Sequence, residues 1–180
     1  MLLNRFPFGL QVDWVDTERF SPVQPELQDW LLNTGSLTER LEGHCERFSV
    51  QVLGQASVAL DNSEKRLLYT QSDQDWQVRE VILHGDDQPW VFARSVLPLA
   101  LCEAELKNLG SKPLGKRIFN DPEFVRSEFE VGRMLVHPLT NQSKTGHALY
   151  ARRSCFTMQG QQLLVAEAFL PDCPCYQNIA

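Results

Sequence analysis

Two runs rich in β-branched and aromatic residues flank a Gly-Asp-Asp turn in WQVREVILHGDDQPWVFARSVLP, residues 76–98. Strand-forming runs on either side of such a turn predict a β-hairpin. Pro98 ends the second run, because proline cannot donate a hydrogen bond within a sheet. The chain is therefore expected to contain an antiparallel sheet, and the remaining segments must supply its other strands and the helices that pack against it.

Two pairs of segments have helical periodicity. The first pair begins with PELQDWLLNTG, residues 25–35, which has proline at its first helical position and glycine at its end. Ser36, followed three residues later by Glu39, has the form of a capping box and predicts a second helix over residues 37–45. The second pair lies in LALCEAELKNLGSKPLGKRIF, residues 99–119, where a glycine and a proline interrupt the pattern. Each pair is expected to form a helix-turn-helix unit.

The period changes to that of a strand at residue 48, because Phe48, Val50 and Val52 alternate with polar residues. Residues 55–75 are polar and irregular, and we interpret them as a strand remnant followed by a loop. Three more strands are expected in the segments SEFEVGRML, GHALYARRSCFTM and QQLLVAEAFLP.

The order of these elements is helices, strands, helices and strands. It predicts an α+β fold with a single, mainly antiparallel sheet of about six strands, not the alternating strands and helices of a nucleotide-binding fold. A chain of 180 residues, of which 43% are hydrophobic, is long enough for one domain with a sizeable core. We therefore expect one domain over residues 1–180.

Charge and hydropathy limit the class of partner. The formal net charge is -6 and the sequence pI is about 5.2, so the chain lacks the basic stripe of a protein that binds duplex nucleic acid. No segment approaches the ~20 apolar residues of a membrane span, and the N-terminus has no apolar run followed by a cleavage site. We expect a cytoplasmic monomer that binds a small molecule and does not insert into membranes.

Metal-binding signals are weak. The five cysteines are odd in number and scattered, which indicates reduced thiols instead of a disulfide framework. The sequence Cys173-Pro174-Cys175 has no further cysteine or histidine at ligand spacing, so it is a poor zinc motif. None of the four histidines pairs with a carboxylate at a recognisable metal spacing. We expect neither a metal nor another cofactor.

Glu167 is an unusual residue for its position, inside the strand QQLLVAEAFLP at residues 161–171. Side chains alternate across a strand, so Leu163, Val165 and Phe169 share the face of Glu167, and the opposite face is apolar as well. Burial of a lone carboxylate costs several kcal/mol unless the group is paired or protonated. Another part of the chain must therefore provide a partner.

Three arginines on other apolar strand faces could provide it: Arg79 beside Val81 and Leu83, Arg94 beside Phe92 and Val96, and Arg133 beside Phe129 and Val131. A guanidinium group stays charged when buried and binds carboxylates through two parallel hydrogen bonds. Two interpretations are open on spacing alone. Glu167 either forms a structural salt bridge with one of these arginines or belongs with them to a pocket for a small anion.

The chain also resembles the chorismate lyase family. The matching stretches occur in the family's order over residues 27–176 and are LQDWLLNTGSLTERL, WQVREVIL, PWVFARSVLP, LGSKPLGKRIF, EVGR and LLVAEAFLPDCPCY. The resemblance implies a single antiparallel sheet with helices on one side. It also implies that the helix pairs at residues 22–46 and 101–119 are two flaps over a buried ligand.

The resemblance also implies roles for individual residues. Arg79 corresponds to the arginine that binds the ring carboxylate, and Glu167 to the glutamate that meets the ring hydroxyl. These two are the expected catalytic residues. Leu37 and Leu114 correspond to backbone or wall contacts with the ligand. Arg94 and Arg133 are further candidates for ligand binding.

The activity implied is that of a cofactor-independent carbon–oxygen lyase. It would convert chorismate to 4-hydroxybenzoate and pyruvate, the first committed step towards ubiquinone or a related quinone. Two alternatives follow from the same resemblance. The fold is also that of a non-catalytic effector-binding domain in bacterial transcription regulators, which carry a DNA-binding winged helix ahead of it, whereas only about 46 residues precede the first clear strand here. A lyase-like protein without activity would only sequester the product.

Overall fold

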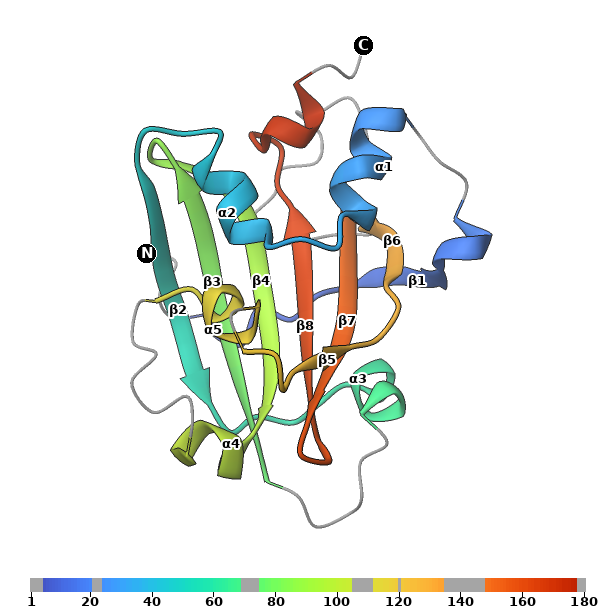
Figure 1. Cartoon of the computed structure of the whole chain (residues 1–180), viewed down its shortest axis with the longest axis vertical. Coiled ribbons are helices and arrows are strands. Elements are labelled where there is room, and N and C mark those ends of the chain that lie inside the picture. The colour runs from blue at the N-terminus through green and yellow to red at the C-terminus, as the bar shows by residue number, and fades with distance from the viewer. Residues whose placement is uncertain are drawn as a thin grey trace.

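Strand pairing organises the computed structural model, which describes residues 5–20, 24–68, 75–104, 112–119, 121–134 and 148–177. Within these residues one sheet of eight strands runs in the order β1-β6-β7-β8-β4-β3-β2, with β5 paired to β7 (Figure 1). All the described pairings are antiparallel. The strands are β1 Val12–Asp16, β2 Phe48–Ala56, β3 Trp76–Gly85, β4 Gln88–Pro98, β5 Val125–Arg126, β6 Glu130–Met134, β7 Tyr150–Met158 and β8 Gln161–Phe169.

The predicted α+β fold with one antiparallel sheet is confirmed. The sheet has two strands more than the expected six, because β1 adds an edge beside β6 and the short β5 pairs with the end of β7. The expected hairpin is also present as β3 and β4. Asp86 and Asp87 in its turn have positive φ values of 48° and 67°, as the tight turns that suit the twist of a hairpin require.

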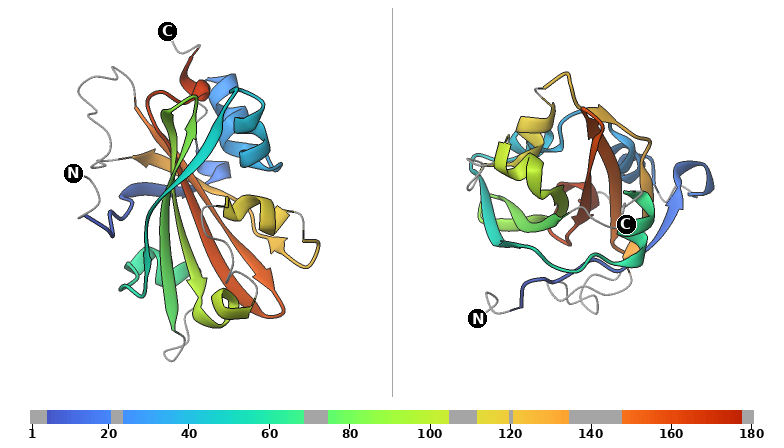
Figure 2. Two further views of the ribbon diagram at one scale, coloured as in Figure 1. Left: turned by 90° about the vertical axis from the view of Figure 1, so that its left-hand side faces the viewer. Right: turned by 90° about the horizontal axis from the view of Figure 1, so that it is seen from below.

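Helices cover both faces of the sheet. They are α1 Pro25–Leu32, α2 Leu37–Glu42, α3 Asn62–Leu67, α4 Leu99–Ala104 and α5 Leu114–Phe119, with short 3-10 turns at η1 Thr17–Arg19 and η3 Pro174–Tyr176. The views from the front and the side place α1, α2 and α5 over one face (Figures 1 and 2). We call this the pocket face. Helix α3 lies against the opposite face. The expectation that the helices lie on one side of the sheet is therefore wrong.

Helix α3 corrects the interpretation of residues 55–75 as a strand remnant and loop. Strand β2 continues to Ala56, and a helix follows after a short connection. Its start is fixed by a capping box: the Asp61 carboxylate accepts from the Glu64 N–H at 2.9 Å, and the Glu64 carboxylate accepts from the Asp61 N–H at 2.9 Å. Residues 69–74 lie outside the described part of the chain.

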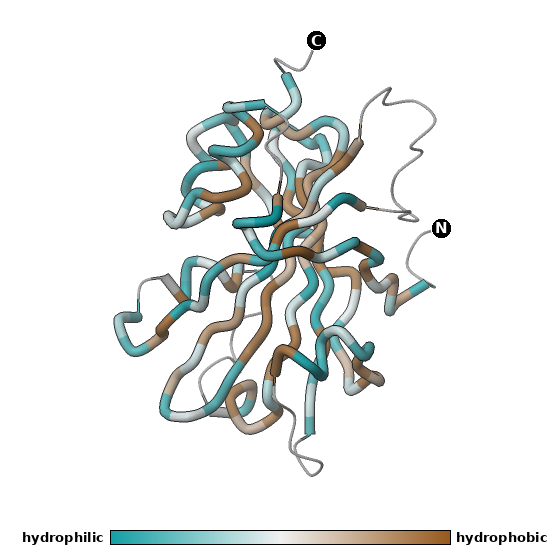
Figure 3. The backbone as a smooth tube through the Cα atoms, turned by 90° about the vertical axis from the view of Figure 1, so that its right-hand side faces the viewer, coloured by the Kyte–Doolittle hydropathy of each residue, from teal (hydrophilic) through white to brown (hydrophobic). Residues whose placement is uncertain are grey.

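The core lies on both sides of the sheet. Hydropathy alternates along the strands, so apolar residues reach both faces (Figure 3). Leu27, Leu31 and Leu41 from α1 and α2 are fully buried above the pocket face, and each contributes roughly 1.5–3 kcal/mol of burial free energy. Leu60 and Leu68 flank α3 and pack on the opposite face. None of the described helices is long and apolar enough to cross a membrane.

Candidate active site

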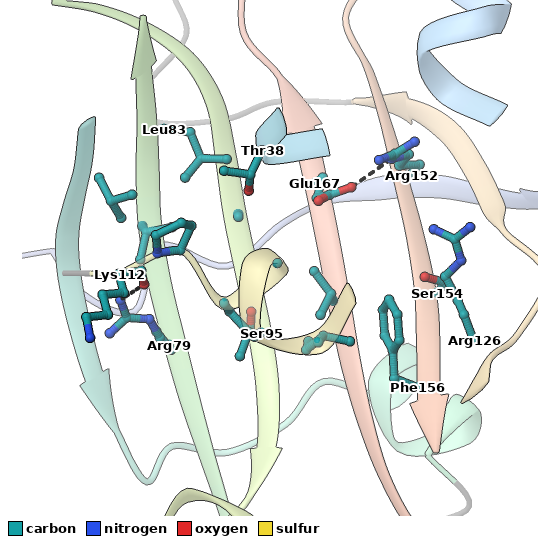
Figure 4. A pocket seen from close by; sticks show the side chains of 18 of the residues that line it. Thr38, Arg79, Leu83, Ser95, Lys112, Arg126, Arg152, Ser154, Phe156 and Glu167 are labelled. Carbon is teal, nitrogen blue, oxygen red and sulfur yellow. Dashed lines mark hydrogen bonds and ion pairs between the residues drawn. The ribbon is translucent and has the colours of Figure 1, made fainter. Parts of the chain in front are cut away.

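A pocket opens between the pocket face of the sheet and the helices above it (Figure 4). Alternate residues of five neighbouring strands form its floor, since every second side chain of a strand points to the same face. These floor residues are Val50, Arg79, Val81, Leu83, Ala93, Ser95, Arg152, Ser154, Phe156, Val165 and Glu167. The roof comes from α2, the start of α5 and the segment around β5, through residues that include Thr38, Lys112, Leu114, Arg126 and Phe129.

Arg79 lies at one end of the pocket on β3 and is almost completely buried. Its Nη1 donates to Oε1 of Gln55 at 3.2 Å, and its Nη2 lies 3.5 Å from the carbonyl oxygen of Lys112. Burial lowers the pKa of the Arg79 guanidinium, because a charged group loses its hydration there. An anionic ligand beside Arg79 would offset that cost.

Glu167 lies at the other end, on β8, and its partner is Arg152 of β7. Arg152 Nε donates to Glu167 Oε2 at 2.7 Å, and the two side chains are 2% and 18% exposed. Figure 4 shows the pair at the pocket wall, with the Glu167 carboxylate turned towards the space above β8. The glutamate is therefore both ion-paired and available to a ligand.

Arg152 also connects the sheet to the end of α1. Its Nη1 donates to the carbonyl oxygens of Trp30 at 3.1 Å, Leu31 at 3.4 Å and Asn33 at 2.9 Å. The last carbonyl groups of a helix lack partners within the helix, so a guanidinium group is a suitable donor for them. One buried side chain thus holds α1 over the sheet and fixes the Glu167 carboxylate.

Contacts between the elements of the roof hold the pocket closed from above. A Cβ atom added at Gly115 of α5 would lie only 3.0 Å from Oγ1 of Thr38 in α2, so the two helices approach each other closely. Lys116 Nζ pairs with Glu42 Oε1 at 2.6 Å between the same helices. Arg126 Nη2 donates to the carbonyl oxygen of Thr34 at 2.7 Å, which joins β5 to the α1–α2 connection.

A basic group and an acidic group at opposite ends of a mostly apolar pocket can bind a small ring compound that carries an anionic group and a hydroxyl group. The family model for chorismate lyase matches residues 10–179. The chain belongs to the chorismate lyase family.

Two curated relatives cover nearly the whole chain. A protein of Pseudoalteromonas atlantica named "Probable chorismate pyruvate-lyase" is 44% identical over 97% of this chain and 94% of its own length. A protein of the same name from a Shewanella species is 38% identical over 92% of each chain. The predicted family resemblance is thus confirmed, and the chain belongs to a family of lyases.

Solved structures similar to this lyase-family chain share its fold. The effector domain of PhnF from Mycobacterium smegmatis has a TM-score of 0.53 at 12% identity, covering 75% of this chain and 88% of that domain. The ligand-binding domain of a GntR-family transcriptional regulator from Bordetella bronchiseptica has a TM-score of 0.52 at 13% identity, covering 71% and 86%. At this identity the likeness concerns the arrangement of the sheet and helices alone.

Arg94 does not belong to the pocket. It lies on the opposite face, where Nε and Nη2 pair with Glu64 at 2.7 and 3.1 Å and Nη1 pairs with Glu80 at 2.8 Å. Burial lowers the pKa of Arg94, but the hydrogen bonds and charges of Glu64 and Glu80 outweigh burial and raise it. Glu80 also accepts from the N–H groups of Phe8 at 2.7 Å and Gly9 at 2.9 Å. Arg94 is therefore part of a structural ion cluster beneath α3.

Arg133 is also outside the pocket. It lies on β6 and is exposed, whereas Phe129 and Val131 are buried. Its neighbours across the strands are Asp13 of β1 and Tyr150 of β7. Arg133 is therefore exposed although Phe129 and Val131 on the same strand face are apolar and buried, and it does not line the pocket.

Of the two leucines, Leu114 lines the pocket and Leu37 does not. Leu37 is the first residue of α2 and packs into the core cluster above the sheet. Its neighbour Thr38 faces the pocket in its place. The predicted capping box of α2 is half formed, since the Ser36 hydroxyl accepts from the Glu39 N–H at 3.3 Å.

The sequence interpretation missed Arg152 and Arg126, and for Arg152 a signal was present. Gln159 and Gly160 form the turn between β7 and β8, with φ values of 49° and 78°. A two-residue turn fixes the register of a hairpin, and counting back from it places Arg152 opposite Glu167. Arg126 stands on a two-residue strand that has no recognisable periodicity.

No group of three or more metal-ligating side chains occurs in the described part of the chain. Cys173 and Cys175 are buried thiols beside α1, away from the pocket. The two flap ranges are described only in part, because residues 22–23 and 105–111 lie outside the described structure. Within the second range, α5 roofs the pocket and α4 contributes no residue to its lining.

Proposed function

We propose that this chain converts chorismate to 4-hydroxybenzoate and pyruvate, and that Arg79 and Glu167 carry the reaction. The supporting observation is that both side chains line one pocket from the same face of the sheet. Arg79 lies opposite Ser95, Ser95 lies opposite Val165, and Glu167 is two residues further along β8. Two strand spacings of about 4.8 Å and two residues of about 3.3 Å separate the two Cα atoms by roughly 12 Å.

A para-substituted six-membered ring would lie between the two side chains, with a charge-assisted hydrogen bond of about 2.8 Å at each end. Arg79 would bind the ring carboxylate through its guanidinium fork, and the buried setting would strengthen that contact relative to water. Val81, Val165 and Leu114 would pack against the ring.

Glu167 would accept a hydrogen bond from the ring hydroxyl group. In the reaction the neighbouring carbinol carbon loses a proton, the electrons of that bond complete the aromatic ring, and the ether bond to the enolpyruvyl group breaks. The departing enolate takes up a proton and becomes pyruvate. The residues contribute by holding one reactive conformer of the substrate and by stabilising the charge on the departing group.

The product would serve as the ring precursor of ubiquinone or a related quinone, in keeping with the family. The relatives' name, chorismate pyruvate-lyase, supports chorismate as the substrate. The chain would release its product through movement of α2 and α5, since these helices form the roof of the pocket.

The deciding experiment is incubation of the purified chain with chorismate in buffer containing EDTA. We expect 4-hydroxybenzoate and pyruvate in equal amounts, measured by chromatography, at a rate well above that of the Arg79→Ala variant. Arg133→Ala is the matched control, since Arg133 is an exposed arginine outside the pocket. Binding of 4-hydroxybenzoate without turnover of chorismate would contradict the proposal and would favour an effector-binding or product-sequestering role.

A further inference from the structure

Several cationic side chains line the pocket besides Arg79. Among the described residues that line it, four are cationic, namely Arg79, Lys112, Arg126 and Arg152, and Glu167 is anionic. Arg79 accounts for the ring carboxylate in the proposed function. Arg126 and Arg152 lie at the other end, beside Glu167. This end of the pocket therefore brings two guanidinium groups close to the Glu167 carboxylate.

Arg126 and Arg152 share an aromatic neighbour. The Cζ atom of Arg126 lies 4.5 Å from the ring centroid of Phe129, and that of Arg152 lies 4.7 Å from the same centroid. Burial lowers the pKa of Arg126, and the charge of Arg152 lowers it further, against the opposing charges of Glu167 and Glu128. Two like charges held together in a partly desolvated site favour the entry of an anion.

One donor of Arg152 has no acceptor in the described part of the chain. Its Nε is used by Glu167, and its Nη1 by the carbonyl oxygens at the end of α1. No hydrogen bond of Nη2 occurs among the described residues, although the side chain is only 2% exposed and lines the pocket. An N–H group of a pocket-lining guanidinium that has no acceptor among the described residues can donate to a ligand oxygen.

We propose that Arg152 Nη2 and the Arg126 guanidinium bind the second carboxylate of the substrate, the one on the enolpyruvyl group that leaves as pyruvate. This inference rests on the proposed function. The hydroxyl and enolpyruvyl groups occupy adjacent ring carbons, so their binding residues must also be adjacent. Glu167 and Arg152 satisfy this requirement, since they are hydrogen-bonded at 2.7 Å.

The arrangement gives Arg126 and Arg152 a part in the reaction as well as in binding. The pyruvyl carboxylate would be held before the ether bond breaks, and the negative charge that develops on the departing oxygen would form beside two fixed guanidinium groups. Arg126 also donates to the carbonyl oxygen of Thr34 at 2.7 Å. Arg126 would thus link binding of the pyruvyl group to the position of the α1–α2 connection in the roof.

The test separates substrate from product, because 4-hydroxybenzoate lacks the second carboxylate. Arg126→Ala should raise KM for chorismate by about 10- to 150-fold, the loss expected for a charged hydrogen bond. It should change the Kd of 4-hydroxybenzoate less than about threefold. Arg79→Ala should weaken both ligands, and Arg126→Lys should recover part of the loss because it retains the charge.

A binding measurement without turnover completes the test. Isothermal titration calorimetry should detect binding of pyruvate to the enzyme saturated with 4-hydroxybenzoate. The same measurement should detect no binding in the Arg126→Ala variant. Equal losses for chorismate and 4-hydroxybenzoate in Arg126→Ala, or unchanged binding of pyruvate, would show that Arg126 only supports the roof. If the unmodified chain does not convert chorismate, the proposed function fails first, and the pyruvate measurement still decides whether this end of the pocket binds a carboxylate.

Discussion

Arg79 and Arg94 lie on neighbouring strands, yet their guanidinium groups are on opposite faces of one sheet. Arg79 lies across from Ser95, and Arg94 lies across from Glu80. Both side chains are almost fully buried. Arg94 pairs with the carboxylates of Glu64 and Glu80, whereas Arg79 lines the pocket. We therefore expect Arg79 to bind ligand and Arg94 to stabilise the fold.

Replacement of Arg79 should therefore affect ligand binding. We expect Arg79→Ala to weaken the binding of 4-hydroxybenzoate by about 2–5 kcal/mol, because a buried charged hydrogen bond is lost. Arg133→Ala should leave the Kd unchanged, since Arg133 is exposed on β6. Isothermal titration calorimetry of the two variants measures both values. Similar affinities for the two variants would show that Arg79 is not the carboxylate anchor.

Replacement of Arg94 should affect stability. Arg94→Ala leaves Glu64 and Glu80 buried without their counter-charge, and we expect the free energy of unfolding to fall by about 3–5 kcal/mol. Lys116→Ala breaks a half-exposed pair and should cost less than about 1 kcal/mol. Urea unfolding of both variants provides the comparison. A loss as small in Arg94→Ala as in Lys116→Ala would argue against the structural role.

Glu167→Gln should reduce both stability and turnover. Arg152 loses its carboxylate but keeps three carbonyl acceptors, so we expect a loss of about 1–3 kcal/mol in unfolding free energy. The kcat should fall by about 10- to 150-fold, because the charged hydrogen bond with the ring hydroxyl is lost.

Glu130→Gln is the matched control for Glu167→Gln. Glu130 pairs with the buried Arg153 at 2.6 Å on the opposite face, and no residue of that pair lines the pocket. The Glu130→Gln variant should lose a similar free energy of unfolding and should retain the kcat of the unmodified chain. Steady-state kinetics beside denaturant unfolding distinguish the two roles, and a normal kcat in Glu167→Gln would make Glu167 a structural partner only.

The contact between α2 and α5 should influence product release. Lys116→Ala removes the pair with Glu42 and should speed the release of 4-hydroxybenzoate by up to about fivefold, the equivalent of a surface ion pair. Arg117→Ala is the control, because Arg117 pairs with Asp121 outside α2. Stopped-flow displacement measures both rates. Equal rates in the two variants would indicate that release does not depend on this contact.

The reactivity of two buried cysteines should depend on pH. Burial raises the pKa of Cys102 and of Cys155 to about 11, since the thiolate is disfavoured away from water. Both thiols should stay protonated and resist iodoacetamide in the folded protein at pH 8, and react after denaturation. Because the folded state holds these protons above the ordinary thiol pKa, stability should decrease as the pH rises from about 9 towards 11. Mass spectrometry identifies the modified residues.

Local sequence patterns sufficed for much of the fold and part of the site. Alternation along β3 and β8 places Arg79 and Glu167 on faces with apolar neighbours, and the structure directs both into one pocket. Turn residues located the β3–β4 hairpin, and Ser36 located the start of α2. These features depend on residues close together in the chain, so they can be recognised without knowledge of the tertiary fold.

The pairing register between neighbouring strands determined the features of the site that local patterns did not predict. Counted from the β3–β4 turn without interruption, Arg79 would lie opposite Arg94 and share its face, but a bulge between Leu83 and His84 shifts the pairing by one residue. A shift of one residue moves every later side chain to the other face, and this directs Arg94 to Glu64 on α3. The sequence by itself predicted six of the described strands and missed β1 and β5. Only the tertiary structure decided which arginines reach the pocket, because a bulge results from the packing of whole strands.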